Sequence, residues 1–393
     1  MSFKDTLKAQ RHAIRDYGMY IAFLVIVVFF TITTKGLFIS SRNIGNLVNA
    51  TSYIAVLAVG MTLVIVIRHI DLSVGYLAGT LGAVAAIALK YWLLPVYATI
   101  PLVLALGIVA GLVTAFLVAQ MGIPAFVATL AGWLFYQGLL QWVTRGTGTI
   151  VIESETFNAL GNGHIPDIPG LEILPGVHTV TLLLGLLAIV LFITGEISNR
   201  KKTQAYNFEV LPMNMFILKL VFVSLVIGGI TWVMAGYQGL SWAAVILIVV
   251  VLVYSYITTR TVVGRHIYAV GGNPEAAELN GISVKKITFL VFGSMGLLTG
   301  LAGILYASWL RSATTIAGRG MELDAIAAAF VGGAAVAGGV GKVTGSILGA
   351  LVMASLTNGM NLLGWDISIQ YMVRALVLAA AVVFDVATRR AAK

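Results

Sequence analysis

The sequence contains no cysteine and very little charge. Without cysteine it carries no thiolate metal site and no redox signal. Only 10% of its 393 residues are charged, whereas a water-soluble domain has about 25%. Hydrophobic residues make up 59% of the chain, and the mean hydropathy is +0.99. These values exclude an ordinary soluble domain and predict a polytopic membrane protein, in which the 43 glycines suit close packing of helices.

Motifs of enzymes and ATPases are also missing. The stretch nearest to a phosphate-binding loop, Gly338–Val343, has valine where serine or threonine must ligate magnesium, so we interpret it as a packing turn. The five histidines show no paired spacing for a metal, and no serine, histidine and carboxylate cluster is recognisable. We therefore predict no catalytic residue, no metal site and no cofactor in this chain. An intramembrane protease remains as an alternative.

Twelve apolar runs approach the length of about 20 residues that crosses a bilayer. They lie near residues 17–34, 44–67, 73–90, 96–118, 122–144, 179–195, 213–234, 241–258, 287–308, 323–340, 343–363 and 368–386. The pattern predicts an all-α membrane protein of about 12 (10–12) transmembrane helices, with one transmembrane domain at 17–393. The charged segment 1–16 lacks a small-residue cleavage site, so we expect a cytoplasmic segment rather than a cleavable signal peptide.

The basic residues indicate how the chain is oriented. If the chain begins inside, 16 of the 24 lysines and arginines fall in cytoplasmic segments, and the loop 146–178 has four acidic residues and no basic one. This bias predicts that both termini are cytoplasmic and that 146–178 is a periplasmic loop. The net charge of +9 is then explained mostly by topology, and we predict no nucleic-acid partner.

A polar interruption at 261–286 contains a compact helix signal. Asn273 suits the N-cap, Pro274 the first helical position and Glu275 the first turn, while Gly281 suits a left-handed stop. A helix of about six or seven residues is too short to be stable alone, so we expect it to pack on something. Its small residues, Ala276 and Ala277, predict close approach to a partner's groove.

Several spaced motifs carry a resemblance that covers nearly everything after residue 17. They are Ile70–Gly75 (IDLSVG), Ile123–Phe126 with Thr129–Gly132, Gly264–Ala269, Gly271–Ala277 with Asn280–Ile282, Glu322–Ala328 (ELDAIAA) and Gly338–Gly341. Together they resemble membrane permeases of the ribose, xylose and multiple-monosaccharide class of ABC importers, in the branched-chain amino acid and sugar permease superfamily. Gln137, Ala334, Ala335 and Asn280 depart from the usual residues, which weakens any inference about which sugar is carried.

The resemblance implies a vitamin-B12-importer-like (type II) bundle in the bacterial inner membrane that translocates monosaccharides. It implies a cytoplasmic coupling loop at 259–286 that docks on a separate ATP-binding cassette subunit, where ATP and magnesium are bound. The coupling residues would be Gly264, Arg265, Gly272, Asn273, Pro274, Glu275, Ala276, Ala277 and Gly281. The other implied partners are a periplasmic sugar-binding protein, a second copy forming a homodimer, and membrane lipid. Compared with ten-span members, 179–234 resembles an inserted helix pair.

Uncharged polar residues recur at helical spacing inside three apolar runs. The stripes are Asn43, Asn46 and Asn49; Trp133, Gln137 and Gln141; and Ser355, Asn358 and Asn361. Amides, hydroxyls and aromatic rings suit the passage of a monosaccharide, so these residues, with Asp71, Ser73 and Asp324, are the predicted translocation path. The alternative is that the stripes are hydrogen-bonding contacts between helices.

Ionisable residues at membrane depth leave a second function open. Asp71, Glu322, Asp324 and Arg374 are costly there unless they are paired or hydrated. In a proton- or sodium-coupled secondary carrier such groups would form the relay. We interpret Asp71, together with Ser73, rather as a residue that starts the third span.

Overall fold

The computed structural model describes residues 22–170, 174–206, 210 and 212–390. Their contacts divide into two compact units. The first takes the described residues of Met1–Phe38, Leu47–Gly163 and Ala243–Lys393, and the second takes Ile39–Asn46 and the described residues of His164–Trp242. The predicted cytoplasmic segment 1–16 and the beginning of the predicted span 17–34 lie outside the described residues.

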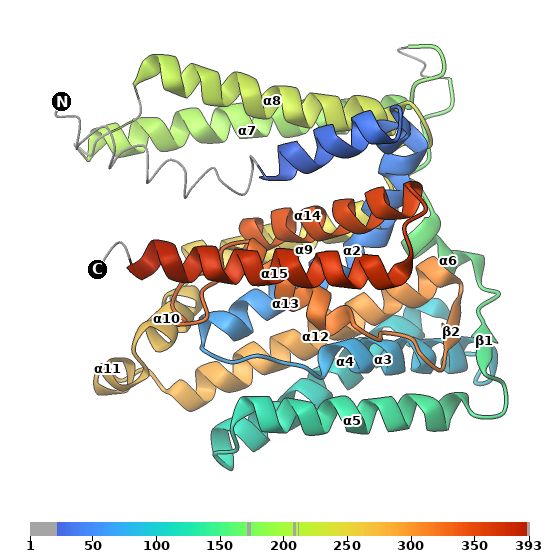
Figure 1. The fold of residues 1–393 in the computed structure, drawn as a ribbon, viewed down its shortest axis with the longest axis vertical. Helices are drawn as coiled ribbons and strands as arrows, with labels where there is room; N and C mark the ends of the chain where they lie inside the picture. Colours follow the sequence, from blue (N-terminus) through green and yellow to red (C-terminus); the bar gives the residue numbers. More distant parts are fainter. Residues whose placement is uncertain (1–21, 171–173, 207–209, 211, 391–393) are drawn as a thin grey trace. The chain divides into compact units, whose positions relative to one another are not determined.

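Helices make up nearly all of the first unit (Figure 1). In chain order they are an apolar helix Ala22–Thr33, the 3-10 helix η1 (Leu37–Ile39), α2 (Ser41–Val66), α3 (Val74–Lys90), α4 (Val96–Ala115) with the π-helical turn η2 (Phe116–Gln120), α5 (Ala125–Thr144), α6 (Glu155–Asn162), α9 (Trp242–Arg260), α10 (Val262–Gly272), α11 (Pro274–Leu279), α12 (Val284–Leu310), α13 (Met321–Val331), α14 (Val343–Leu362) and α15 (Ile367–Arg390). Two three-residue strands, β1 (Thr149–Val151) and β2 (Ser312–Thr314), pair antiparallel.

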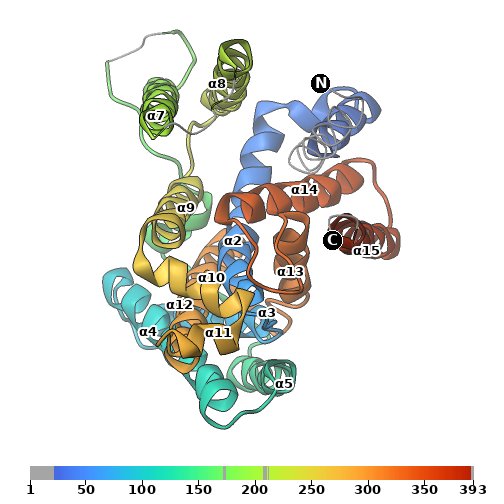
Figure 2. The ribbon, with the colours of Figure 1, turned by 90° about the vertical axis from the view of Figure 1, so that its left-hand side faces the viewer.

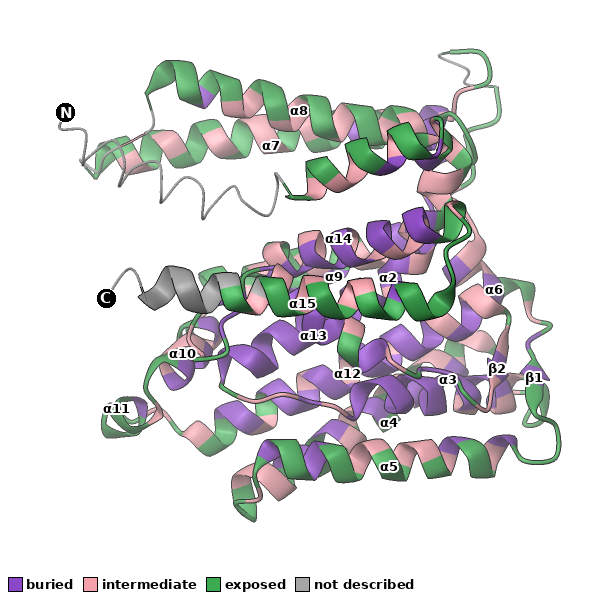
Figure 3. Cartoon of the chain, viewed as in Figure 1, coloured by how far each residue is buried: buried purple, intermediate pink, exposed green. Residues whose placement is uncertain are grey.

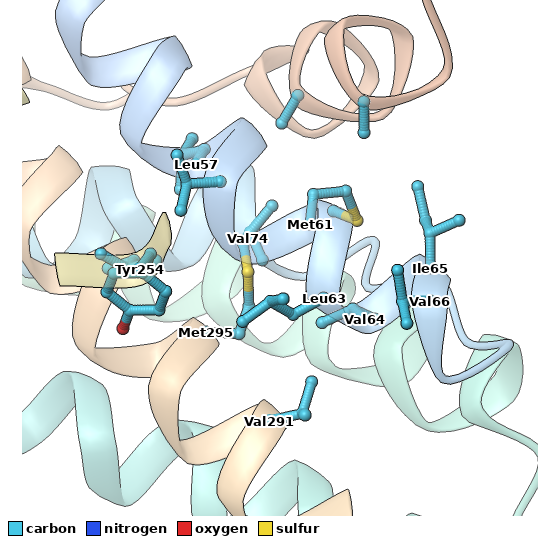
Figure 4. Close-up of a cluster of buried hydrophobic side chains, with 14 of the residues drawn as sticks. Leu57, Met61, Leu63, Val64, Ile65, Val66, Val74, Tyr254, Val291 and Met295 are labelled. Carbon is cyan, nitrogen blue, oxygen red and sulfur yellow. The ribbon is translucent and has the colours of Figure 1, made fainter. Parts of the chain in front are cut away.

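The core of this unit lies around α2 and α12, which are buried over most of their lengths (Figure 3). Figure 4 shows Leu63 of α2 next to Met295 of α12, and Met61 and Val291 belong to the same buried cluster. Glycine lets neighbouring helices approach at their backbones: a Cβ at Gly107 of α4 would lie 2.3 Å from the Gly296 carbonyl oxygen. The high glycine content is thus used where apolar helices touch.

The two ends of α12 carry different structures (Figure 1). At its C-terminal end, β2 pairs with β1, and α6 is held by the Asn162 amide, which donates to the Ser308 carbonyl at 2.7 Å. The Ser308 hydroxyl also accepts from the Gly161 N–H at 2.7 Å. At the N-terminal end of α12 lie α10 and α11. Residues 146–163 of the acidic loop and the basic polar loop therefore lie at opposite ends of one long helix.

The second unit is built on an antiparallel pair, α7 (Thr179–Ala205) and α8 (Met213–Ala235). The start of α7 is held by the Asp167 carboxylate, which accepts from the Thr179 and Val180 N–H groups at 2.8 and 3.0 Å. Desolvation works to raise the pKa of Asp167, but these backbone hydrogen bonds outweigh it and hold that pKa below its usual range. The two helices pack on each other, and on their other sides they expose apolar side chains (Figure 3).

Within the described residues, seven helices are long and apolar enough to cross a membrane. They are α2, α4 with η2, α7, α8, α9, α12 and α14, and three shorter apolar helices are Ala22–Thr33, α3 and Ile367–Ala380 in α15. Helix α5 has 20 residues but is less apolar than these seven. The protein is therefore an all-α, multi-pass membrane protein, as predicted.

The predicted span 323–340 is wrong as a continuous helix. Helix α13 has 11 residues and ends at Val331, which corresponds to about 16 Å of helix against about 30 Å of bilayer hydrocarbon. Glycine explains the stop. Gly333 has φ +88°, and Gly332 packs directly on the Gly345 backbone of α14, where a side chain would not fit. Residues 332–342 then form a glycine-rich loop instead of two further helical turns.

Candidate functional site

The short helix predicted in the polar loop is present as α11. The Asn273 side chain accepts from the Ala276 N–H at 3.0 Å, Pro274 is the first helical residue, and Gly281 has φ +80°. The six-residue helix packs against the beginning of α12, and Figure 2 shows it beside α10 and α12. Cap, start and stop are thus confirmed, and packing supports a helix that is too short to persist alone.

The two alanines of α11 face different surroundings. Ala277 is 4% exposed and belongs to the hydrophobic core, whereas Ala276 is exposed. The expectation that Ala277 meets a partner's groove is therefore wrong, because the residue seats α11 on its own protein. Leu279 is 90% exposed, and Glu275 and Glu278 are exposed around it. We call Glu275, Ala276, Glu278 and Leu279 the outer face of α11.

The first part of the polar loop also forms a helix, α10. The segment Thr261–Gly264 begins with a threonine, a residue type that favours the N-cap, so the sequence could have indicated this helix. The Thr261 hydroxyl accepts from the Gly264 N–H at 3.2 Å and caps α10. Gly264 is buried and packs against the end of α9, where a Cβ would lie 2.4 Å from the Ile257 and Thr258 carbonyl oxygens. Arg265 is exposed. Of the predicted coupling residues, Gly264 is therefore a packing residue and Arg265 a surface residue.

Three segments distant in sequence meet at the end of α10. Arg68, which follows α2, donates from Nε to the Gly271 carbonyl at 2.7 Å and from its guanidinium to the Gly272 carbonyl. The Gly339 N–H donates to the Val66 carbonyl at 2.8 Å. Arg68 itself has φ +65°, an uncommon conformation for a residue with a side chain.

A further hydrogen bond completes this meeting point. The Tyr268 hydroxyl of α10 donates to the Gly341 carbonyl at 2.5 Å. Close approach requires glycine here, since a Cβ at Gly271 would lie 1.9 Å from the Val66 carbonyl oxygen. We call this set the Arg68 junction: Val66, Arg68, Tyr268, Gly271, Gly272, Gly338, Gly339 and Gly341. It ties α10 directly to the glycine-rich loop after α13, and sequence reasoning did not identify Arg68 or Tyr268 as its members.

Two buried carboxylates lie where α3, α5 and α13 meet. Asp71 accepts from the Ser73 N–H and hydroxyl at 2.9 and 2.6 Å, which confirms that the two residues shape the start of α3. Glu322, in the first turn of α13, accepts from the Trp133 indole N–H at 3.0 Å. Its other oxygen lies against Gly75 and has no hydrogen-bond partner among the described residues. This arrangement joins α13 to α5 and α3.

The third carboxylate, Asp324, forms an ion pair with Arg374 of α15. The two side chains are 24% and 20% exposed, so the pair is only partly sealed from its surroundings. It satisfies the requirement that a charge at membrane depth be paired. Figure 2 shows α13, α14 and α15 next to one another.

The three predicted polar stripes have different surroundings. On α14, Ser355 is buried and its hydroxyl has no hydrogen-bond partner among the described residues, while Asn361 accepts from the Gln370 amide of α15 at 2.7 Å. On α2, Asn49 is buried and Asn46 exposed. On α5, Gln137 is half-buried and Gln141 exposed. The stripes thus combine exposed groups with at least two interhelical contacts, at Trp133 and Asn361.

The sequence matches a known protein family over most of its length. Residues 43–164 and 171–382 match the family described as branched-chain amino acid transport system / permease component. This match includes α2 to α14, the Arg68 junction and α11. The chain belongs to this permease family. The resemblance seen in the motifs is confirmed, and the protein is a component of a transport system rather than an enzyme.

Individual relatives match the permease over nearly its whole length. It is 37% identical to the xylose transport system permease protein XylH of Haemophilus influenzae, over 95% of this chain and 96% of the relative. The corresponding protein of Escherichia coli K12 is also 37% identical, over 95% and 92%. The ribose import permease protein RbsC of Haemophilus influenzae is 32% identical, over 93% and 91%. No solved structure matches the permease.

Proposed function

We propose that this permease is the membrane-spanning subunit of an ATP-binding-cassette importer that brings monosaccharides, xylose first among them, across the bacterial inner membrane. The observation that carries the proposal is the 37% identity to xylose permeases over 95% of the chain. The similarity to ribose permeases, at 32% identity, supports a pentose or related sugar as the substrate class.

The energy of transport comes from another chain in this proposal. An ATP-binding cassette subunit binds ATP and magnesium and docks on the outer face of α11, and a periplasmic binding protein delivers the sugar. Leu279 is 90% exposed at the end of α11, so its side chain is available to a docking partner. Two copies of the permease form the functional unit, and lipid covers the exposed apolar side chains of α7 and α8.

The Arg68 junction supplies the route by which docking moves the bundle. Helix α11 follows α10 directly, and α10 is hydrogen-bonded through Arg68 and Tyr268 to the ends of α2 and of the glycine-rich loop. That loop connects α13, which carries Glu322 and Asp324, to α14. We infer that closure of the ATPase pair displaces α11 and thereby shifts α13, a short helix that the glycine-rich loop joins to α10 and α2.

We propose twelve crossings with both termini cytoplasmic, in a type II bundle. The ten apolar helices and α5 account for eleven of them. The twelfth consists of α13 and the glycine-rich loop, since β2 precedes α13 at one end of the bundle and Gly339 reaches Val66 at the other. Discontinuous helices of this kind line transport sites in other carriers. In this topology α11 faces the cytoplasm. A substitution on α11 that detaches the ATP-binding subunit would therefore support the topology as well.

We also propose an inserted module and a translocation path. The pair α7 and α8, with the preceding residues from His164, has its own set of contacts, which supports its treatment as a separate inserted module. For the path, the partial exposure of Gln137, Gln141 and Asp324 supports access to a passing sugar. The hydrogen bond between Asn361 and Gln370 supports an interhelical role for that asparagine instead.

Substrate class is tested by competition during uptake. In membrane vesicles that contain the permease, its ATP-binding subunit and its binding protein, radiolabelled xylose should accumulate with ATP. Excess unlabelled ribose or another aldopentose should compete, and leucine should not. Accumulation of leucine with no accumulation of xylose would replace the sugar assignment with the amino-acid substrate of other members of the superfamily.

A further inference from the structure

In each of the two central helices, α2 and α12, one tyrosine is partly exposed within a stretch of buried residues. Between Thr51 and Ile67, Tyr53 is the one residue of α2 and its extension that is not buried. Between Ala302 and Ser308 of α12, the same holds for Tyr306. Their ring centroids are 5.0 Å apart. The two helices therefore open to their surroundings at one shared place.

A third ring extends this opening. Trp309, also half-buried, has its ring centroid 5.8 Å from that of Tyr53 and 6.4 Å from that of Tyr306. The rings meet at tilted or edge-on angles of 32° to 66°. We call Tyr53, Tyr306 and Trp309 the aromatic cluster. Such a set of partly exposed rings offers flat apolar faces of the kind that contact the C–H faces of sugars.

Charged groups beside the cluster indicate that the opening faces water and not lipid. Arg374 is close enough to the Tyr53 hydroxyl for the two groups to interact electrostatically, and it also pairs with Asp324. Both charged side chains keep a fifth or more of their surface exposed. An ion pair at membrane depth that faced hydrocarbon in this way would be strongly unfavourable, so it should line a hydrated space.

The polar groups suit a polyhydroxylated ligand. The pair supplies guanidinium donors and carboxylate acceptors. One turn from Tyr53 on α2 lies Asn49, which is 7% exposed and whose amide oxygen has no hydrogen-bond partner among the described residues. Residues four apart share a face of a helix, so Asn49 lies on the same side of α2 as Tyr53. A buried acceptor of this kind favours a ligand that donates a hydrogen bond.

The position of this group of residues fits the entrance of a path. Tyr306 lies four residues before the end of α12 and Arg374 seven residues after the start of α15, so both are within about 6–11 Å of the helix ends. Those ends are on the side of β1 and β2, which is the proposed periplasmic side.

We propose that the aromatic cluster, Asn49 and the Asp324–Arg374 pair form a monosaccharide-binding site in the outer half of the permease. The rings stack on the apolar face of the sugar, and Asn49, Asp324 and Arg374 exchange hydrogen bonds with its hydroxyls. The chemical class of the ligand rests on the proposed function, whereas the position of the site rests on the geometry.

The first test measures binding without any partner protein. The purified permease in lipid nanodiscs should transfer magnetisation to the protons of D-xylose in saturation-transfer NMR. Trp309→Leu and Tyr53→Leu should reduce this signal about tenfold, while Tyr53→Phe should keep most of it because the ring remains. Trp92→Leu is the matched control, since Trp92 is 56% exposed and lies in the turn after α3. Thermal unfolding of each variant shows that the fold is retained.

The second test separates failure of the site from failure of the proposed function. In the uptake assay, Trp309→Leu should raise KM for xylose about tenfold, whereas Trp92→Leu should leave KM and ATP hydrolysis by the complex unchanged. Wild-type xylose uptake with an unchanged KM in both Trp309→Leu and Tyr53→Leu would overturn the site and leave the importer standing. A wild-type permease that binds leucine and not xylose would overturn the sugar assignment together with the site.

Discussion

Arg68→Gly should leave the transport complex assembled and able to hydrolyse ATP, yet lower sugar uptake at least tenfold. The arginine joins the end of α10 to the end of α2 by two hydrogen bonds to the Gly271 and Gly272 carbonyls. Hydrogen bonds from a charged donor each contribute about 1.5–3 kcal/mol. Their loss would release α10 from the end of α2, to which the Gly339 N–H of the glycine-rich loop is also bonded. Only the Tyr268 hydroxyl would then tie α10 to that loop among the side-chain hydrogen bonds of the Arg68 junction, so ATP hydrolysis would be largely uncoupled from transport.

Glycine is the informative substitution at this position. The left-handed conformation of Arg68, with φ +65°, is strained for alanine and relaxed for glycine, so the variant loses the guanidinium without added backbone strain. Tyr268→Phe removes one hydroxyl, the donor to Gly341, and should give a weaker form of the same defect. Arg68→Lys keeps the charge and loses the two-pronged geometry, so it should not restore coupling.

The quantity to measure is the number of sugar molecules imported per ATP hydrolysed. Arg145→Gly provides the control, because Arg145 is an exposed basic residue beyond the opposite end of the bundle, just after α5. A normal ratio in Arg68→Gly and in the double variant with Tyr268→Phe would show that the Arg68 junction does not transmit the motion.

Leu279→Glu should detach the ATP-binding subunit and reduce uptake to background. Leu279 is 90% exposed and contributes almost nothing to the stability of the free permease. A carboxylate at the centre of an apolar contact would lose its hydration without gaining a partner. Co-purification of the ATP-binding subunit should therefore fall more than tenfold, while insertion and thermal stability of the permease stay unchanged.

Two neighbouring substitutions distinguish docking from folding of α11. Ala277→Trp places a large side chain in the buried seat of the helix, so it should lower both ATPase docking and local stability. Asn273→Ala should cost about 1 kcal/mol through loss of the cap and reduce docking only partly. Leu93→Glu changes an 80% exposed leucine in the turn between α3 and α4 and should have no effect. Full docking in Leu279→Glu would mean that the subunit binds elsewhere.

Local signals were sufficient to predict much of this molecule. The cap, proline and glycine of α11 act within a few residues, and so the helix from Pro274 to Leu279 could be predicted from the chain alone. The same holds for most apolar helices, including α3. The orientation of Ala277 has no local signal, because it depends on which helix packs behind it. The early end of α13 has one in the pair Gly332 and Gly333, but the apolar run continues past it to residue 340 and concealed the stop.

The functional groups that sequence reasoning missed share that dependence on tertiary contact. Arg68 was recognised only as a basic residue at a membrane edge, yet its partners lie about 200 residues away in the chain. Tyr53 and Tyr306 appear in apolar runs like any other aromatic residue. Their shared opening is visible only when α2 and α12 are placed side by side.

The source of energy distinguishes an ABC importer subunit from a secondary carrier. The permease, its ATP-binding subunit and its binding protein are reconstituted in proteoliposomes with ATP on the side of α11, and the permease is also reconstituted alone. We predict that xylose moves against its gradient only in the complete system with hydrolysable ATP, and that imposed proton or sodium gradients drive no accumulation. Gradient-driven accumulation by the permease alone would contradict this account and identify a secondary carrier.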